Sequence, residues 1–317
     1  MNKGMTAVQI SSKPFNYWAS ASRDTSIIWT AELVEQHKES WDWVMLSLNP
    51  SLPWSKDFLD QFKERWVWNC ISDNYGIPWT AETLELFKDS LLWSWLSGSE
   101  SIQWTADLLE QFKDRWNWGC LSSNPSIPWT EDLLEQFSEH WFWCSISYNH
   151  YIPWTAELID QYKDRLNWGY LSENESLPWS IELLEQFEDR WNWYGLSGNP
   201  KLPWTTELLE LFKSRWNWNY LSDTPGLPWS TELIVRYEDY WDWEFFQFTI
   251  ETFWTLEQFE ELEDVICWKA LSSNTMLYWT EALIEKYKDR LDFDCLSKNP
   301  FLPMELQLLV INDHFQS

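Results

Sequence analysis

The chain has 317 residues, of which 19% are aromatic and 30 are Trp. Its 50 acidic residues outnumber its 22 basic residues, and the net charge of −28 argues against binding DNA, RNA or an anionic membrane. The same charge favours a basic partner, divalent cations, or simply solubility. Because so many aromatic side chains can be buried, we expect a folded chain rather than a disordered one.

The N-terminal segment and the cysteines indicate where the protein resides. Residues 1–18 contain no apolar stretch long enough for a signal peptide, and the chain has no run of about 18 apolar residues for a membrane span. Three of the five cysteines, Cys70, Cys120 and Cys295, occupy one equivalent repeat position, which favours reduced packing residues over disulfides. We therefore expect a cytoplasmic protein.

A repeat of 25 residues organises almost the whole chain. Trp recurs at this interval from Trp29 to Trp279, and Met304 takes the next place in the register. Residues 29–303 therefore contain eleven repeats, of which those at 229–278 are atypical. A degenerate repeat at 1–28 and a truncated helix at 304–317 are expected to cap the two ends.

The repeat at 104–128 shows a helical pattern. Thr105 is a natural N-cap, and Asp107 stands in the first turn, where the helix dipole favours an acid. Four apolar residues then follow helical spacing on one face, namely Leu108, Leu109, Phe112 and Trp116. The pattern predicts a first helix over about 106–115.

A shorter second helix is predicted in the same repeat. Asn117 is a candidate N-cap, since seven of the eleven repeats have Asn or Asp at this position. Trp118 and Leu121 are three residues apart, on one face of this helix. The helix should end before Asn124-Pro125, because Asn tolerates the left-handed conformation and Pro cannot continue a helix.

A leucine-rich repeat with a strand in each unit is the main alternative fold. The leucine-rich pattern needs an apolar residue five positions before its Asn. In this chain that position holds Gly119 in the repeat at 104–128, and Asn69 and Ser94 in other repeats. The helical pattern fits better. We therefore predict an all-α solenoid of about eleven helix-turn-helix repeats, in which Trp recurs at equivalent positions.

Most of the Trp residues are predicted to be core residues. They recur at the positions of Trp104, Trp116 and Trp118, which share a face with the apolar stripe of the repeat. We expect ladders of buried rings between stacked repeats. The alternative is an exposed aromatic platform that binds sugars or bases.

The string WNWGCLSSNPSIPWT resembles the W-x-W-x-x-L-S-x-N-P-x-I/L-x-W motif of Trp-rich tandem-repeat proteins, which occur in bacteria and large DNA viruses. The resemblance covers nearly the whole chain. It supports the assignment of repeats, and it implies no catalytic activity.

Acidic residues form three columns along the repeats, at the positions of Asp107, Glu110 and Asp114. Each column carries an acid in ten of the eleven repeats, and the spacing places all three on one helix face. One interpretation is a docking surface for a basic partner. The other is a solvated face that keeps a Trp-rich protein soluble.

The stretch from Trp241 to Trp254, WDWEFFQFTIETFW, keeps the register but loses the motif. It either bends the solenoid or forms an apolar contact patch. Its phenylalanines are our first candidates for partner contact, namely Phe245, Phe246, Phe248 and Phe253. Tyr148, at a position that varies between repeats, is a further candidate, together with the acidic columns.

The sequence contains no arrangement typical of catalysis. The four His residues lack ligand spacing, and the chain has no zinc-protease, phosphate-loop or dinucleotide motif. We therefore predict no enzyme activity, no cofactor and no metal site. The leading hypothesis is a scaffold that binds a protein. The alternatives are an acidic inhibitor or nucleic-acid mimic that occupies a basic partner, and a carbohydrate-binding rod.

Overall fold

The computed structural model describes residues 15–222, 224, 226–243, 256–273, 277, 279–299 and 302. These residues form helices α2–α23 and no β-strand, which confirms the all-α repeat solenoid over the leucine-rich alternative. They belong to two compact units, Met1–Pro153 and Trp154–Ser317, whose boundary coincides with a repeat boundary. None of the helices in this part of the chain has the length and apolar character needed to cross a membrane.

Each described repeat begins with a first helix of six or seven residues. In the first unit these helices are α3 (Ala31–Gln36), α5 (Lys56–Gln61), α7 (Ala81–Phe87), α9 (Ala106–Gln111) and α11 (Glu131–Gln136). In the second unit they are α13 (Ala156–Tyr162), α15 (Ile181–Gln186), α17 (Thr206–Leu211), α19 (Thr231–Arg236), α20 (Leu256–Leu262) and α22 (Glu281–Tyr287).

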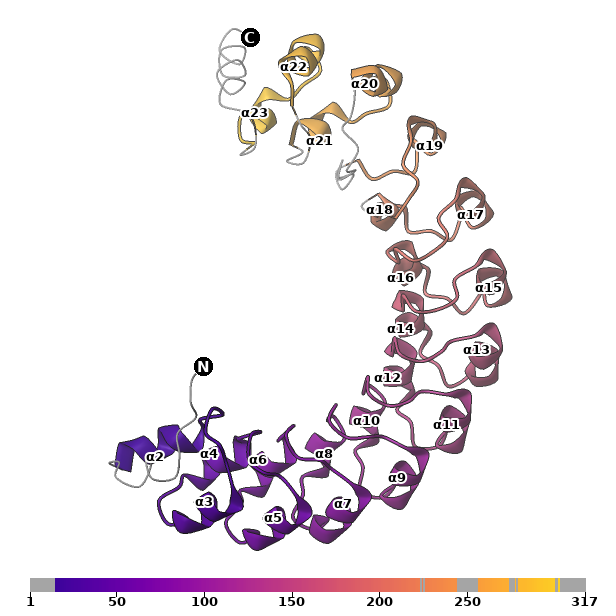
Figure 1. Ribbon diagram of the computed structural model, residues 1–317. Coiled ribbons are helices and arrows are strands. Elements are labelled where there is room, and N and C mark those ends of the chain that lie inside the picture. The colour runs from indigo at the N-terminus through magenta and orange to yellow at the C-terminus, as the bar shows by residue number, and fades with distance from the viewer. Residues whose placement is uncertain are drawn as a thin grey trace. The chain divides into compact units, whose positions relative to one another are not determined.

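A second helix of four to six residues follows after a turn. In the first unit the second helices are α4 (Trp43–Leu48), α6 (Trp68–Ser72), α8 (Trp93–Leu96), α10 (Trp118–Leu121) and α12 (Trp143–Tyr148), preceded by α2 (Phe15–Ser22). In the second unit they are α14 (Trp168–Glu173), α16 (Trp193–Ser197), α18 (Trp218–Leu221), α21 (Trp268–Ser273) and α23 (Phe293–Leu296). Within each unit the first helices form one row and the second helices another (Figure 1).

The first helices begin as predicted but end earlier. At α9 the Thr105 hydroxyl accepts the N–H of Leu108 at 3.1 Å, and Asp107 stands in the first turn. The helix ends at Gln111 rather than near residue 115, and a turn follows. Beyond α9 the Lys113 carbonyl accepts the indole N–H of Trp118 at 2.9 Å. Indole donors of this kind satisfy backbone carbonyls that a longer helix would bond internally.

The second helices begin at the predicted N-cap. The Asn117 side chain accepts the N–H of Cys120 at 3.1 Å, and Asp42 and Asp292 cap their own second helices in the same way. The helix ends before Asn124-Pro125 as predicted, but not through the left-handed conformation, because no described residue, glycine included, has a positive φ. The Asn124 side chain instead bonds to the neighbouring repeat.

A buried serine makes the first bond between repeats. The Ser97 hydroxyl donates to the Trp93 carbonyl at 2.6 Å and accepts the N–H of Asn117, which precedes α10 of the next repeat, at 2.8 Å. It thereby joins the end of one second helix to the start of the next. The same pair of bonds recurs at Ser22, Ser47, Ser72, Ser122, Ser172, Ser197, Ser222 and Ser272.

The Asn of each repeat makes the second bond between repeats. Asn124 is 2% exposed, and its amide nitrogen donates to the carbonyls of Ser97 and Ser99 at 3.0 and 3.1 Å. Its side-chain oxygen accepts the N–H of Ser126 at 2.8 Å and so closes the loop. Asn49, Asn74 and Asn199 make the equivalent pair of bonds to the preceding repeat. We call this arrangement of Ser and Asn the Ser–Asn joint.

Three indole rings pack beside a joint wherever the position of Trp116 holds Trp. Trp93 contacts Trp116 of the next repeat with ring centroids 4.7 Å apart, and Trp116 contacts Trp104 at 5.0 Å. The indole N–H of Trp129 donates to the backbone carbonyl of the joint residue Asn124 at 3.1 Å. The expected ladders therefore consist of separate Trp clusters, interrupted where this position holds another residue such as Leu91 or Leu166, and edge-to-face contacts of this kind stabilise them.

We expect that Asn124→Ala lowers the free energy of unfolding by about 2–3 kcal/mol, because it leaves buried carbonyls without a donor. The change is measured as a shift in the urea midpoint by circular dichroism. Ser123→Ala, at an exposed neighbouring position, is the control and should shift the midpoint little. Equal, small shifts for both variants would contradict the role of the joint.

Candidate functional site

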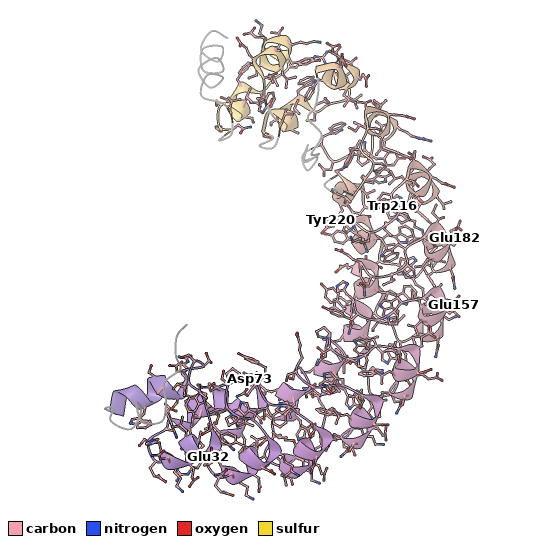
Figure 2. The ribbon with its side chains drawn as sticks, viewed as in Figure 1. Glu32, Asp73, Glu157, Glu182, Trp216 and Tyr220 are labelled. Carbon is pink, nitrogen blue, oxygen red and sulfur yellow. The ribbon has the colours of Figure 1, made fainter. Side chains whose placement is uncertain are left out.

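The exposed side chains of the first helices form an acidic surface, which we call the first-helix face. Asp107 and Glu110 are exposed on α9, and Asp114 is exposed in the turn that follows it, so the prediction of one helix face holds for the first two acids only. In the second unit, Glu157 and Glu182 lie on this side of the chain, Tyr220 lies on the opposite side, and Trp216 lies between them (Figure 2). The two rows of helices thus present chemically different surfaces.

Basic residues of the same chain are bonded mainly to two of the three acidic columns, and in the third column Lys56 pairs with Glu82. Lys113 pairs with Glu110 at 2.7 Å within its repeat, and Arg115 pairs with Asp89 of the preceding repeat at 2.7 Å. Equivalent pairs recur within the column of Glu110 and between neighbouring repeats in the column of Asp114. These exposed pairs contribute little stability individually. They do compensate much of the negative charge on this face.

The third column, that of Asp107, supports the helix starts. At Glu32, hydrogen bonds from its own backbone N–H and from the Thr30 hydroxyl lower the pKa of the carboxyl. At Glu182, backbone bonds and the Ser180 hydroxyl lower the pKa in the same way. A carboxylate near free N–H groups is the arrangement that the helix dipole favours. The column therefore has a structural role that needs no partner.

A buried tyrosine links the first helices of two repeats in the second unit. The Tyr237 hydroxyl donates to Glu210 at 2.9 Å, and Tyr237 is fully buried. Burial, followed by the hydrogen bond to Glu210, raises the pKa of Tyr237 to about 12. This group is therefore neutral over the physiological range and acts as a hydrogen-bond donor.

The exposed side chains of the second helices form a different surface, which we call the second-helix face. Aromatic residues stand there at positions that vary between repeats and are between 46% and 55% exposed: Trp95, Tyr148, Tyr170, Tyr194 and Tyr220. Of these, sequence reasoning singled out only Tyr148 as a contact residue. The others were detectable because they occupy the columns of Gly119 and Cys120, whose residue type changes from repeat to repeat.

Variable positions of neighbouring repeats contact one another on this face. The rings of Tyr194 and Tyr220 lie 4.8 Å apart. Tyr220 also covers Gly198 of the preceding repeat so closely that a Cβ built there would lie 2.2 Å from the ring. A glycine at this position therefore gives an aromatic residue of the next repeat room to lie flat on the surface. Residues that look independent in the sequence form shared features in space.

The structure describes only some of the candidate contact residues. Tyr148 is 52% exposed at the end of α12, with its ring 5.1 Å from that of His150. The acidic columns lie on the first-helix face, whereas Tyr148 lies on the second-helix face, so the structure does not bring them together. The four phenylalanines, Phe245, Phe246, Phe248 and Phe253, lie outside the described residues.

The cysteines and acids form no further recognisable centre in the described part of the chain. All five Cys residues are free thiols, and burial raises the pKa of Cys70 and Cys295. Among the described residues no three His, Cys, Asp or Glu side chains gather in a way that could hold a metal ion.

Comparison with known proteins does not assign the chain to a family. No family model matches the chain, and no match is found among curated proteins or among solved structures. The resemblance to Trp-rich tandem-repeat proteins therefore stays a prediction.

Trp95 is the only exposed Trp among the described residues, whereas Trp93, in the same helix, is 9% exposed. We expect acrylamide to quench wild-type fluorescence with a steeper initial slope than in Trp95→Phe, because the most accessible described indole is then removed. Trp93→Phe is the control and should leave the initial slope nearly unchanged. A larger effect of Trp93→Phe would contradict this description of the face.

Proposed function

We propose that the chain is a non-enzymatic scaffold that binds a partner protein through its second-helix face. One observation carries this proposal: the exposed aromatic residues stand at the variable positions of the repeats, while the invariant positions build helices and joints. Tyr and Trp dominate the binding energy of protein interfaces, because they bury a large area with few rotatable bonds.

Burial of the indoles other than that of Trp95 supports a protein-binding scaffold over a carbohydrate-binding rod. Most described Trp rings at the positions of Trp104 and Trp116 are buried in the clusters beside the joints. Many of the indole N–H groups donate to backbone carbonyls, as those of Trp54 and Trp129 do. A sugar platform needs a row of open ring faces, and the described indoles offer only that of Trp95.

The acidic inhibitor or nucleic-acid mimic receives less support. A mimic needs a surface of uncompensated negative charge, whereas Lys113, Arg115 and their equivalents pair with many of the acids in two of the three columns. The net charge of −28 still favours a partner with a basic surface, because long-range attraction speeds association. We therefore propose a basic partner that contacts the second-helix face.

The proposal is tested with two matched triple variants in the same three repeats. Tyr170→Ser, Tyr194→Ser and Tyr220→Ser remove aromatic contacts from the second-helix face. The control variant removes acids from the first-helix face and consists of Glu157→Gln, Glu182→Gln and Glu207→Gln. Tagged chains are purified from the native host, and the proteins that copurify are quantified by mass spectrometry, with circular dichroism as the folding control.

We expect at least one protein to copurify with the wild type and with the Glu variant but to be reduced at least about tenfold with the Tyr variant. Loss with the Glu variant alone would contradict the proposed face and support the acidic inhibitor. An unchanged set of proteins in all three purifications would contradict the use of either face in this part of the chain.

A further inference from the structure

The repeat at 79–103 has an altered joint. Ser99 stands where eight of the eleven repeats have Asn, and Glu100 follows it where five repeats have Pro. A serine side chain ends one bond short of the amide nitrogen of Asn. The Ser99 hydroxyl bonds within its own loop, to the Ser101 hydroxyl at 2.8 Å and the Ser101 N–H at 3.3 Å. At the regular joint before it, Asn74 instead reaches the carbonyls of Ser47 and Asn49.

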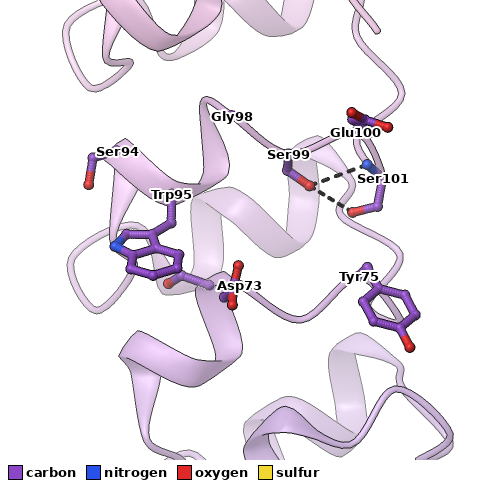
Figure 3. Close-up of a pocket in the computed structure, with 9 residues that line it drawn as sticks. Asp73, Tyr75, Ser94, Trp95, Gly98, Ser99, Glu100 and Ser101 are labelled. Atoms are coloured by element: carbon purple, nitrogen blue, oxygen red, sulfur yellow. Dashed lines mark hydrogen bonds between the residues drawn. The ribbon is translucent and has the colours of Figure 1, made fainter. Parts of the chain in front are cut away.

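A cavity of about 550 Å³ lies at this altered joint. Its walls come from both sides of the joint, with Asp73 and Tyr75 on one repeat and Trp95, Gly98 and Glu100 on the next (Figure 3). Its volume is within the range of about 300–1,000 Å³ typical of ligand pockets. The cavity lies on the second-helix face and entirely within the first unit.

The residues at this joint differ from those at a joint where the equivalent surface is filled. Trp95 is equivalent to Tyr220, and Asp73 is equivalent to Gly198, which the Tyr220 ring covers. Gly98 adds no side chain to the cavity wall, and a Cβ built there would meet nothing closer than the Trp95 carbonyl at 3.6 Å. The cavity therefore accompanies a change of side chains at variable positions and not a break in the fold.

The lining of the cavity selects for a cation. Trp95 is 54% exposed and Tyr75 is 74% exposed, so both rings are available to a ligand. The carboxylates of Asp73 and Glu100 also line the cavity, and neither is in an ion pair with a described residue. No Lys, Arg or His is among the lining residues. Figure 3 shows Asp73 beside Trp95 and Tyr75 on the other side of the cavity.

We propose that this cavity binds an arginine side chain of the partner protein. A guanidinium group stacks on an indole face and pairs with a carboxylate in a fixed planar geometry, which Trp95 and the neighbouring Asp73 match, while Glu100 adds negative charge to the cavity wall. Two carboxylates without a neighbouring base would repel phosphate, nucleotides and acidic peptides. This inference rests on the proposed function, because it specifies the chemistry by which the second-helix face recognises a basic partner.

The test uses a blocked Gly-Arg-Gly peptide titrated into the full-length, ¹⁵N-labelled chain. The readout is the indole N–H signal of Trp95, which is identified by its absence in Trp95→Phe. The comparison peptide is Gly-citrulline-Gly, because citrulline has the shape of arginine without its charge. Two double variants accompany the wild type. Asp73→Asn with Glu100→Gln changes the cavity, and Asp57→Asn with Asp107→Asn removes the same charge from the first-helix face.

We expect the arginine peptide to shift the Trp95 signal saturably and the citrulline peptide to shift it weakly. The cavity variant should weaken binding of the arginine peptide at least about tenfold, and the first-helix variant by less than about twofold. Equal binding of the two peptides would overturn the proposal in favour of a neutral ligand, such as a sugar. Equal weakening by the two double variants would overturn it in favour of a general effect of net charge.

The two proposals can fail separately. If the arginine peptide leaves the Trp95 signal unchanged while the Tyr variant still loses its copurifying protein, the cavity proposal is wrong and the scaffold proposal stands. If the peptide binds in the cavity while the Tyr variant keeps every copurifying protein, the contact surface proposed at Tyr170, Tyr194 and Tyr220 is wrong.

Discussion

The Ser–Asn joint is the interaction on which the rest of this structure depends. Helices of four to seven residues are too short to be stable alone, so each repeat needs its neighbours. Ser97 and Asn124 hold the repeats in register through buried hydrogen bonds, and the indoles of Trp93, Trp104 and Trp116 pack beside them. Since the buried groups are bonded, the joint stabilises one geometry and disfavours slipped arrangements.

Because the joints hold the repeats together, the residues on the two exposed faces are free to differ. The first-helix face carries acids that pair with Lys and Arg of the chain or support helix starts, as Lys113 and Glu32 illustrate. The second-helix face carries residues that the joints do not need, so their identity can change from repeat to repeat without loss of the fold. Trp95 and Tyr220 show the two outcomes of such change: an open cavity between Trp95 and Asp73, and a filled surface where Tyr220 covers Gly198.

The register, the helix caps and the buried positions of Trp were predictable, because each leaves a periodic signal in the sequence. The pairing of Ser97 with Asn117 was not, since periodicity shows that a residue recurs but not which residue of the next repeat it contacts. The sequence did not predict the early end of α9. The indole N–H groups of Trp116 and Trp118 donate to backbone carbonyls there, and helix propensities do not account for such side-chain donors. Among the exposed aromatic residues, Trp95 was recognisable because it stands outside the Trp columns, at a position whose residue type varies.

Hydrogen exchange at the Asn117 amide tests the central role of the joint most directly. This N–H donates to the buried Ser97 hydroxyl at 2.8 Å, and the equivalent N–H of Asn192 donates to Ser172 at 2.9 Å. The account predicts slow exchange at Asn117 in the wild type. In Ser97→Ala exchange there should be about tenfold faster, with Asn192 unchanged. Equal exchange rates at Asn117 in the two proteins would show that the joint does not hold the repeats together.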